Sequence, residues 1–273
     1  MLVQIFALCC NLFIFWYIFF MENLLDIKQT LDWYILSGVD ETCGDVPCRF
    51  LKTEEPPLTA RTQTSSNFMQ NTIASTQNAR EICAKAQTLQ ALKQAALDFN
   101  GCALKTTAKS TVFGDGNEHA KVMLIGEAPG ADEDRIGLPF VGRSGRLLEK
   151  MLLSIGLKRD DVYITNVVMW RPPGNRTPTD AEVAICLPFL KRQIDLVCPK
   201  IIVFLGASAA NALLDNQDSV SKMRGRFMDY VTADKKEICA LATFHPAFLL
   251  RNTAQKAKSW SDFLRILKKL KEN

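Results

Sequence analysis

Short, mainly apolar runs recur along the C-terminal two thirds of the chain, and each ends abruptly in polar or turn-forming residues. The runs fall at residues 122–125, 161–168, 200–205 and 238–244. Runs of this length are typical of strands that are covered on both faces. After the first run, apolar residues recur at helical spacing from Leu147 to Ile155. The pattern therefore predicts an α/β fold in which four buried strands form one sheet.

The turn after the first predicted strand combines flexible backbone with polar chemistry. Residues 126–130 read GEAPG, and the acids Glu127 and 132–134 lie in or close to this turn. Phe140 follows next to a proline, and Ser144 is the expected N-cap of the next helix. Carboxylates and an aromatic ring beside exposed backbone amides predict a polar pocket that can hydrogen-bond and stack a planar ligand.

Two other predicted strands also end in polar side chains. Asn166 lies near the end of the second strand, and the loop after it carries Arg171, Asn175 and Arg176. The fourth strand delivers His245 at its C-terminal end. In open α/β folds, ligands bind at the edge of the sheet where the strands end. We therefore expect these side chains to surround one site.

Four ordered blocks of motifs extend over about residues 99 to 270. They are VFGDGN at 112–117 with GEAPG at 126–130, ITNVV at 164–168 with RPPGNR at 171–176, FLGASAA at 204–210, and FHPAFLLR at 244–251. This set resembles the uracil-DNA glycosylase superfamily, and most closely the bacterial and archaeal branch called family four, whose members often carry an iron–sulfur cluster. The resemblance implies a three-layer α/β/α sandwich with a central parallel four-stranded sheet.

The resemblance also implies a monofunctional uracil-DNA glycosylase of base excision repair, which hydrolyses the N-glycosidic bond of deoxyuridine in DNA and leaves an abasic site. Such an enzyme must expose the base and stabilise the uracil anion that leaves. Phe140 would stack on the flipped uracil, Asn166 would hydrogen-bond its Watson–Crick edge, and His245 would donate to uracil O2. Glu127 and the backbone at Ala128 would line the same pocket.

Ala128 stands where the best-known branch of the superfamily has the aspartate that activates water, so a general base is absent from that place. Glu133 or Asn175 could position water instead, and we expect Glu133 to be the auxiliary catalytic residue. The alternative is that Glu133 is a solvated acid of the loop. Departure of a stabilised uracil anion needs little nucleophilic help, so electrostatics can carry most of the rate.

The resemblance places DNA contacts in two loops. Arg171, Arg176 and Arg251 would contact phosphates around the mouth of the pocket. The loop after His245 would enter the minor groove, and Leu249 and Leu250 are its candidate wedge residues. We expect one of these two leucines to pack into the core instead.

The cysteines depart from the pattern of the cluster-bearing relatives, which have four ligands. This chain has Phe99 and Trp170 at two of those positions and keeps Cys102 and Cys186 at the other two. A cubane cluster normally needs four thiolates, so we expect neither a 4Fe-4S cluster nor another metal. The two aromatic rings would fill the vacated space, and the two cysteines would be buried small hydrophobes.

Composition changes this picture little. The chain has 273 residues, 48% of them hydrophobic, and a formal charge of +4, which by itself does not imply nucleic acid. Nine cysteines without metal-ligand spacing indicate reduced thiols rather than a disulfide framework. We expect a cytoplasmic monomer that acts on uracil-containing DNA without a nucleotide cofactor.

The N-terminal part divides into segments of different character. Residues 1–20 carry no charge and are long enough to span a bilayer, so they are a membrane anchor if Met1 is the genuine start. The other interpretation, which we favour, is that they lie upstream of the residue at which the working enzyme starts, Met21. Tethering to a membrane gives a DNA repair enzyme little advantage. The expected organisation is an apolar segment at 1–20, a helical segment at 21–51, a flexible linker at 52–80 and the catalytic domain at 81–273.

Two alternatives to the glycosylase remain. One is a relative that binds uracil and forms a lasting DNA adduct through a histidine in a longer loop, but no such insertion follows residues 137–143. The other is a non-catalytic DNA-binding or polymerase-associated module. The joint presence of Phe140, Asn166 and His245 argues against this module, since a scaffold would not need all three.

Overall fold

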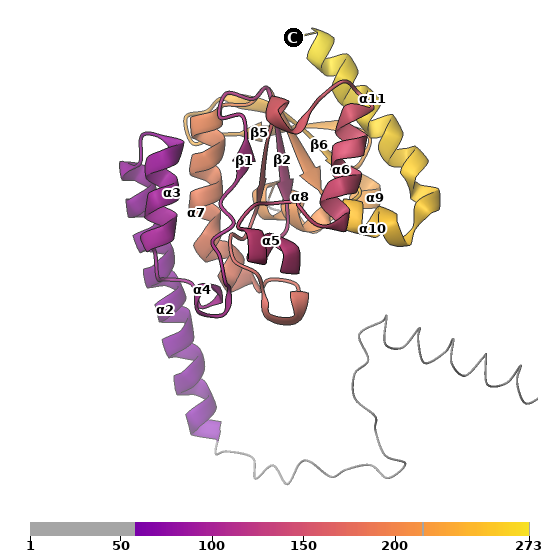
Figure 1. Cartoon of the computed structure of the whole chain (residues 1–273). Helices are drawn as coiled ribbons and strands as arrows, with labels where there is room; N and C mark the ends of the chain where they lie inside the picture. Colours follow the sequence, from indigo (N-terminus) through magenta and orange to yellow (C-terminus); the bar gives the residue numbers. More distant parts are fainter. Residues whose placement is uncertain (1–57, 215, 273) are drawn as a thin grey trace, which may run out of the picture. The chain divides into compact units, whose positions relative to one another are not determined.

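A six-stranded mixed sheet lies at the centre of the part of the chain that this computed structural model describes, residues 58–214 and 216–272 (Figure 1). Its strand order is β1-β3-β2-β4-β6-β5. The strands are β1 Asp115–Gly116, β2 Val122–Gly126, β3 Val162–Asn166, β4 Ile201–Leu205, β5 Phe227–Val231 and β6 Glu237–Thr243. The four central strands are parallel, as predicted, and β1 and β5 pair antiparallel to them at the two edges.

The two edge strands were not predicted, because neither has the sequence pattern of a buried strand. β1 is only two residues long and ends in Gly116. β5 is partly exposed, and Asp229 lies in its middle. An edge strand with one solvated face lacks the continuous apolar run of a central strand. The sheet is therefore mixed rather than purely parallel.

Helices cover both faces of this sheet. They are α2 Leu58–Lys85, α3 Leu89–Asp98, α4 Leu104–Thr107, α5 Ala131–Ile136, α6 Arg143–Leu153, α7 Asp180–Val197, α8 Ala207–Leu214, α9 Val220–Met223, α10 Pro246–Arg251 and α11 Lys256–Glu272. Short 3-10 turns are η1 Arg159–Asp161, η2 Pro173–Asn175 and η3 Thr253–Gln255. Residues 59–273 form one compact unit.

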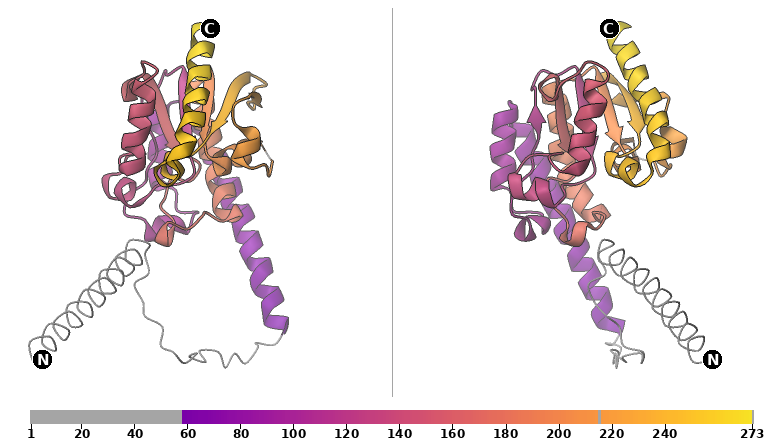
Figure 2. Two further views of the ribbon diagram at one scale, coloured as in Figure 1. Left: turned by 90° about the vertical axis from the view of Figure 1, so that its right-hand side faces the viewer. Right: turned by 45° about the vertical axis from the view of Figure 1, so that its right-hand side comes forward.

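Successive residues of the central strands point to opposite core clusters. Val122 and Leu124 belong to the cluster that the sheet shares with α6 and α11. Met123 and Ile125 belong to the cluster on the other face, with residues of α7 and α8. Figure 2 shows α11 on the opposite side of the sheet from α2 and α3, the latter packing on α7. This arrangement confirms the predicted three-layer α/β/α sandwich.

The predicted flexible linker at 52–80 is wrong from Leu58 onward, because α2 is helical through this stretch. The segment is rich in Thr, Ser, Gln and Asn, but it contains neither Pro nor Gly between residues 58 and 85. Its C-terminal part buries Ala79 and Cys83 in the core, which gives the helix a packed face. The predicted start of the domain at residue 81 thus falls inside α2.

The predicted apolar segment at 1–20 and helical segment at 21–51 lie outside the described residues, as does the start of the linker. Within the described residues, none of the helices has the length and apolar character needed to cross a bilayer.

Backbone pairing continues past the strand ends and carries the polar motifs to one edge of the sheet. Gly126 and Asn166 are paired across β2 and β3. Beyond them, the N–H of Val168 donates to the carbonyl of Glu127 at 3.0 Å. On the other side, the N–H of Gly206 donates to the carbonyl of Thr243, two residues before His245. The C-terminal ends of β2, β3 and β6 therefore meet at one place.

Candidate active site

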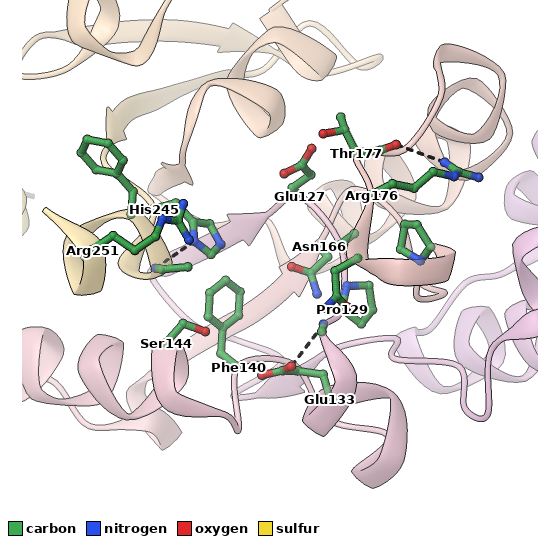
Figure 3. A pocket seen from close by; sticks show the side chains of 16 residues that line it. Glu127, Pro129, Glu133, Phe140, Ser144, Asn166, Arg176, Thr177, His245 and Arg251 are labelled. Atoms are coloured by element: carbon green, nitrogen blue, oxygen red, sulfur yellow. Dashed lines mark hydrogen bonds between the residues drawn. The ribbon is translucent and has the colours of Figure 1, made fainter. Parts of the chain in front are cut away.

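A pocket of about 460 Å³ opens at the C-terminal ends of β2, β3 and β6 (Figure 3). It brings together most of the side chains predicted from sequence. Its lining residues are Glu127, Ala128, Pro129, Gly130, Glu133, Phe140, Ser144, Asn166, Pro172, Asn175, Arg176, Thr177, His245, Ala247, Phe248 and Arg251. Of the predicted site residues, only Arg171, Leu249 and Leu250 are missing from this lining.

Gly126 allows two of these side chains to approach each other at the floor of the pocket. A β-carbon at this position would collide with the amide oxygen of Asn166 and with the ring of Phe140. Any other residue would therefore push the amide and the ring out of place. The first glycine of GEAPG is thus required by the close approach of two pocket side chains.

The amide of Asn166 is buried, with its oxygen left unpaired. The residue is 2% exposed, and Oδ1 has no hydrogen-bond partner among the described residues. A buried amide oxygen without a partner costs free energy, so such groups are rare unless a ligand completes them. Asn166 thus presents an acceptor and a donor side by side, which can pair with the edge of a planar base.

Phe140 forms an aromatic wall of the pocket from a strained backbone. Its φ angle of 52° lies in the left-handed region, which residues other than glycine rarely adopt. The side chain is 5% exposed, and its ring centroid lies 5.6 Å from that of His245, with an interplanar angle of 34°. Strain of this kind persists where the surrounding structure enforces it and is typical of functional sites.

Glu133 is buried and organises the loop around Phe140. One carboxylate oxygen accepts hydrogen bonds from the N–H groups of Val141 and Gly142, at 3.0 and 2.9 Å. The other accepts from the N–H of Gly130 at 3.1 Å. Because the residue is only 8% exposed, its interpretation as a solvated loop acid is wrong.

The predicted N-cap of α6 is also corrected. The cap is Gly142, and Ser144 is the second residue of the helix, where it lines the pocket. The carboxylate of Glu133 accepts a hydrogen bond from the N–H of this cap residue at 2.9 Å.

His245 has a defined tautomer because it caps α10. Its Nδ1 accepts a hydrogen bond from the N–H of Ala247 at 3.1 Å, so the neutral ring carries its proton on Nε2. The protein encloses most of the ring, and this burial lowers the pKa of His245 from 6.5 to about 4, with nearby Arg251 adding to the effect and Glu133 opposing it. At neutral pH the residue is therefore an uncharged hydrogen-bond donor.

The three arginines predicted at the mouth of the pocket differ in their hydrogen-bond and ion-pair partners. Arg176 forms a two-pronged ion pair with Glu182, at 2.8 and 2.6 Å, and is therefore committed within the protein. Arg171 donates to the side-chain oxygen of Asn175 at 2.8 Å, which steadies a loop where Asn175 has a positive φ. Arg251 is exposed at the rim, with its side chain close to His245 (Figure 3).

The two candidate wedge leucines differ in burial. Leu249 is fully buried on α10, so it is the one of the two leucines that packs into the core, as expected, and it is not available as a wedge. Leu250 is 37% exposed on the same helix. Successive helical residues point in directions about 100° apart, which separates one core leucine from one exposed leucine.

The positions of the missing cluster ligands are filled by aromatic side chains. The rings of Phe99 and Trp170 are stacked with centroids 6.4 Å apart, and Phe99 also contacts the edge of Phe189 at 5.2 Å. Cys102 and Cys186 are buried in the same core. A hydrogen bond links their thiols, and this bond, together with burial, raises the pKa of Cys186 well above its usual range. These residues, called the aromatic cluster below, do not fit a cubane, which needs four thiolates in this space.

Sequence reasoning missed two lining residues that lie in or directly after the recognised motifs. Phe248, in α10, stacks on Phe244, which precedes this helix in the FHPAFLLR motif, with ring centroids 5.0 Å apart. Thr177 follows the RPPGNR motif and accepts a hydrogen bond from Arg176 through its backbone. The signal that could have found both residues was their position in or next to motifs that the sequence already singles out.

Comparison with known proteins agrees with this geometry. The model of the uracil DNA glycosylase superfamily matches residues 113–271. The type-4 uracil-DNA glycosylase of Thermotoga maritima is 43% identical over 158 residues, which cover 58% of this chain and 80% of that protein. The type-4 enzyme of Sulfurisphaera tokodaii is 42% identical, over 66% of this chain and 83% of that protein. That of Archaeoglobus fulgidus is 43% identical, over 60% and 84%. From its motifs, its pocket and these relatives, the chain belongs to the uracil DNA glycosylase superfamily.

Proposed function

We propose that this protein is a monofunctional uracil-DNA glycosylase, which hydrolyses the N-glycosidic bond of deoxyuridine in DNA and leaves an abasic site for repair. The observation that carries the proposal is the unpaired, buried Oδ1 of Asn166, which lies beside the ring of Phe140 in a pocket that also contains His245. The names of the relatives, type-4 uracil-DNA glycosylases, support the same activity.

Asn166 would select uracil by its hydrogen-bonding pattern. Its Oδ1 would accept from N3–H of the base, and its Nδ2 would donate to O4. Cytosine has an acceptor at N3 and an amino group at C4. The acceptor Oδ1 would then face another acceptor, and the donor Nδ2 would face another donor. A site that must pair its buried polar groups rejects the analogue that cannot pair them. Phe140 would stack on the face of the bound base.

His245 would stabilise the leaving group without changing its own charge. The C1′–N1 bond breaks, its electron pair passes into the uracil ring, and negative charge grows on O2. The neutral ring donates from Nε2, because Nδ1 is already occupied by the N–H of Ala247. A hydrogen-bond donor fixed before the reaction needs no reorganisation as the charge forms. Water then adds to C1′ and releases its proton.

Water would be positioned without a strong base, because Ala128 offers no side chain for this role. In Glu133, Oε1 accepts two backbone hydrogen bonds and Oε2 accepts one, which leaves Oε2 with capacity for a water molecule. Asn175 lines the same pocket from the opposite loop. We assign the auxiliary role to these two residues, with Glu133 also holding the loop in shape.

Burial of the recognition residues requires the nucleotide to leave the helix stack. Asn166 and Phe140 are 2% and 5% exposed, so neither can reach a base that stays inside a duplex. Leu250 would occupy the gap in the stack, and Arg171 and Arg251 would contact the backbone. The proposed enzyme acts in the cytoplasm as a monomer, with neither an iron–sulfur cluster nor a nucleotide cofactor.

The test is strand cleavage by the full chain on an oligonucleotide containing one uracil, followed by alkali. We expect breakage at uracil, and a loss of roughly two orders of magnitude or more in His245→Ala with little change in DNA binding. His119→Ala is the matched control, because His119 is exposed in a turn away from the pocket. An absence of breakage with duplex and single-stranded substrates would contradict the proposal. An alkali-resistant protein–DNA adduct would favour the adduct-forming alternative.

A further inference from the structure

The loop that carries Phe140 needs to be held from two sides. Its strained backbone, with φ 52°, leaves the N–H groups of Val141 and Gly142 pointing one way, where Glu133 binds them. The carbonyl groups of Pro139 and Phe140 must be bound separately. A left-handed conformation at a bulky residue is unfavourable and requires such outside contacts.

Arg159 supplies these contacts from the far side of the loop. Its guanidinium donates to the carbonyl oxygen of Pro139 at 2.6 Å and to that of Phe140 at 3.1 Å. The same group forms ion pairs with Asp115 at 2.6 Å and Glu149 at 3.3 Å. The side chain is 20% exposed, so solvent competes little for its donors.

The position of Arg159 in the chain connects this loop with the base-reading strand. Arg159 begins η1, which leads directly into β3, and β3 ends at Asn166. Its partner Asp115 lies in β1, which pairs with β3. One side chain therefore links the strand that carries the Asn166 amide to the loop that carries the Phe140 ring.

We infer that Arg159 is a positioning residue for uracil recognition, which sets the Phe140 ring against the Asn166 amide. The inference rests on the proposed function, since it assigns a role within the same site. The role needs an arginine: the planar guanidinium has five donors and can bind two carbonyls and two carboxylates together, whereas a lysine ammonium has three donors at one point. Arg159 itself does not line the pocket and acts through Phe140.

The test compares Arg159→Lys with the wild-type full chain in two measurements. The lysine keeps a positive charge near Asp115 and can keep the fold, but it cannot bind both carbonyls. We expect the dissociation constant of free uracil, measured by titration calorimetry, to rise about tenfold, in line with partial loss of a stacking contact. The uracil-oligonucleotide concentration for half-maximal cleavage should rise similarly, with a smaller change in the saturating rate.

Arg192→Lys is the matched control. Arg192 also donates through its guanidinium to a backbone carbonyl, that of Ala86 at 2.9 and 2.8 Å, but it lies on α7 away from the pocket. Its uracil affinity and cleavage should equal those of the wild type. If Arg159→Lys does not fold, Asp115→Asn weakens the anchor of the guanidinium with little change in shape, and a roughly threefold weaker uracil affinity is expected.

The outcomes separate the two proposals. Unchanged uracil affinity in a folded Arg159→Lys would overturn the positioning role, and so would an equal change in Arg192→Lys. A wild-type protein that binds uracil but does not cleave DNA would contradict the glycosylase activity and leave the role of Arg159 in base binding measurable. A wild-type protein that neither binds uracil nor cleaves DNA at uracil would overturn both.

Discussion

In the pocket, Asn166 keeps a buried oxygen that has no partner in the described part of the chain, and Phe140 holds a left-handed backbone conformation. In the aromatic cluster, Phe99 and Trp170 are fully packed, and the indole N–H of Trp170 donates to Thr111 at 3.0 Å. Unpaired and strained groups reduce stability, and their combination in one pocket is typical of a functional site, whereas packed aromatic rings stabilise the fold. The comparison indicates that binding capacity and stability reside in different parts of this domain.

The largest effect should come from the aromatic cluster. Phe99→Ala removes a ring that is 2% exposed, and we expect the free energy of unfolding to fall by about 3–5 kcal/mol because a cavity remains. Denaturant unfolding measures this loss. Cleavage per folded molecule should stay near the wild-type value. Ile73→Ala, at a side chain that is 69% exposed on α2, is the control and should change stability by less than about 0.5 kcal/mol.

A loss of cleavage in folded Phe99→Ala, larger than the loss of stability explains, would break the comparison. It would mean that the aromatic cluster supports the catalytic geometry as well as the fold. Placing thiols at both aromatic positions is a further contrast. Phe99→Cys with Trp170→Cys would put four cysteines, with Cys102 and Cys186, at this place, and the visible spectrum of the purified protein reports whether iron is held.

Asn166→Ala should show the opposite behaviour. Loss of the base-reading amide should lower uracil cleavage by about a hundredfold, while the free energy of unfolding changes by less than about 1 kcal/mol because no internal hydrogen bond of Oδ1 is lost. Single-turnover cleavage and denaturant unfolding measure the two quantities. Asn211→Ala is a matched control, since Asn211 also has a buried, unpaired Oδ1 but lies in α8 outside the pocket lining. Equal rates for the two variants would remove Asn166 from base recognition.

Sequence reasoning succeeded where one physical signal dominated. Apolar runs located the four parallel strands, and polar residues at their ends located Asn166 and His245 in one pocket. It failed where the outcome depended on tertiary contacts. The burial of Glu133 depends on the N–H groups of Val141 and Gly142, which belong to a loop that follows its helix and folds over the carboxylate. The contacts of Arg159 join segments that are distant in sequence, and no local pattern encodes them.

The histidine of the pocket should make stability depend on pH. The pKa of His245 is lowered from 6.5 to about 4 in the folded protein, so the unfolded chain binds a proton first as the pH falls. The stability that the buried neutral ring contributes is fully present above about pH 6.5 and is lost as the pH approaches about 4. Between these pH values, we expect the free energy of unfolding of the wild type to fall by up to about 2 kcal/mol more than that of His245→Gln. This figure allows for water that reaches the ring. Urea unfolding at several pH values measures the difference.

His119→Gln is the control for the pH experiment, because this exposed histidine is the other one in the chain. Its stability should follow wild type at every pH. Parallel curves for wild type and His245→Gln would show that the His245 ring is as accessible to protons in the folded protein as in the unfolded chain. That result would contradict the lowered pKa of His245.

The smallest effect should separate the two neighbouring leucines of α10. Leu250→Ala should lower cleavage of uracil in duplex DNA several-fold and leave single-stranded cleavage unchanged, because only a duplex has a stack to hold open. Its stability should hardly change, since the side chain is already 37% exposed. Leu249→Ala, at 0% exposure, should instead lower the free energy of unfolding by about 2–5 kcal/mol. Equal losses on both substrates in Leu250→Ala would contradict a wedge and assign Leu250 to the packing of α10, where it would belong with the stability-bearing part of the domain.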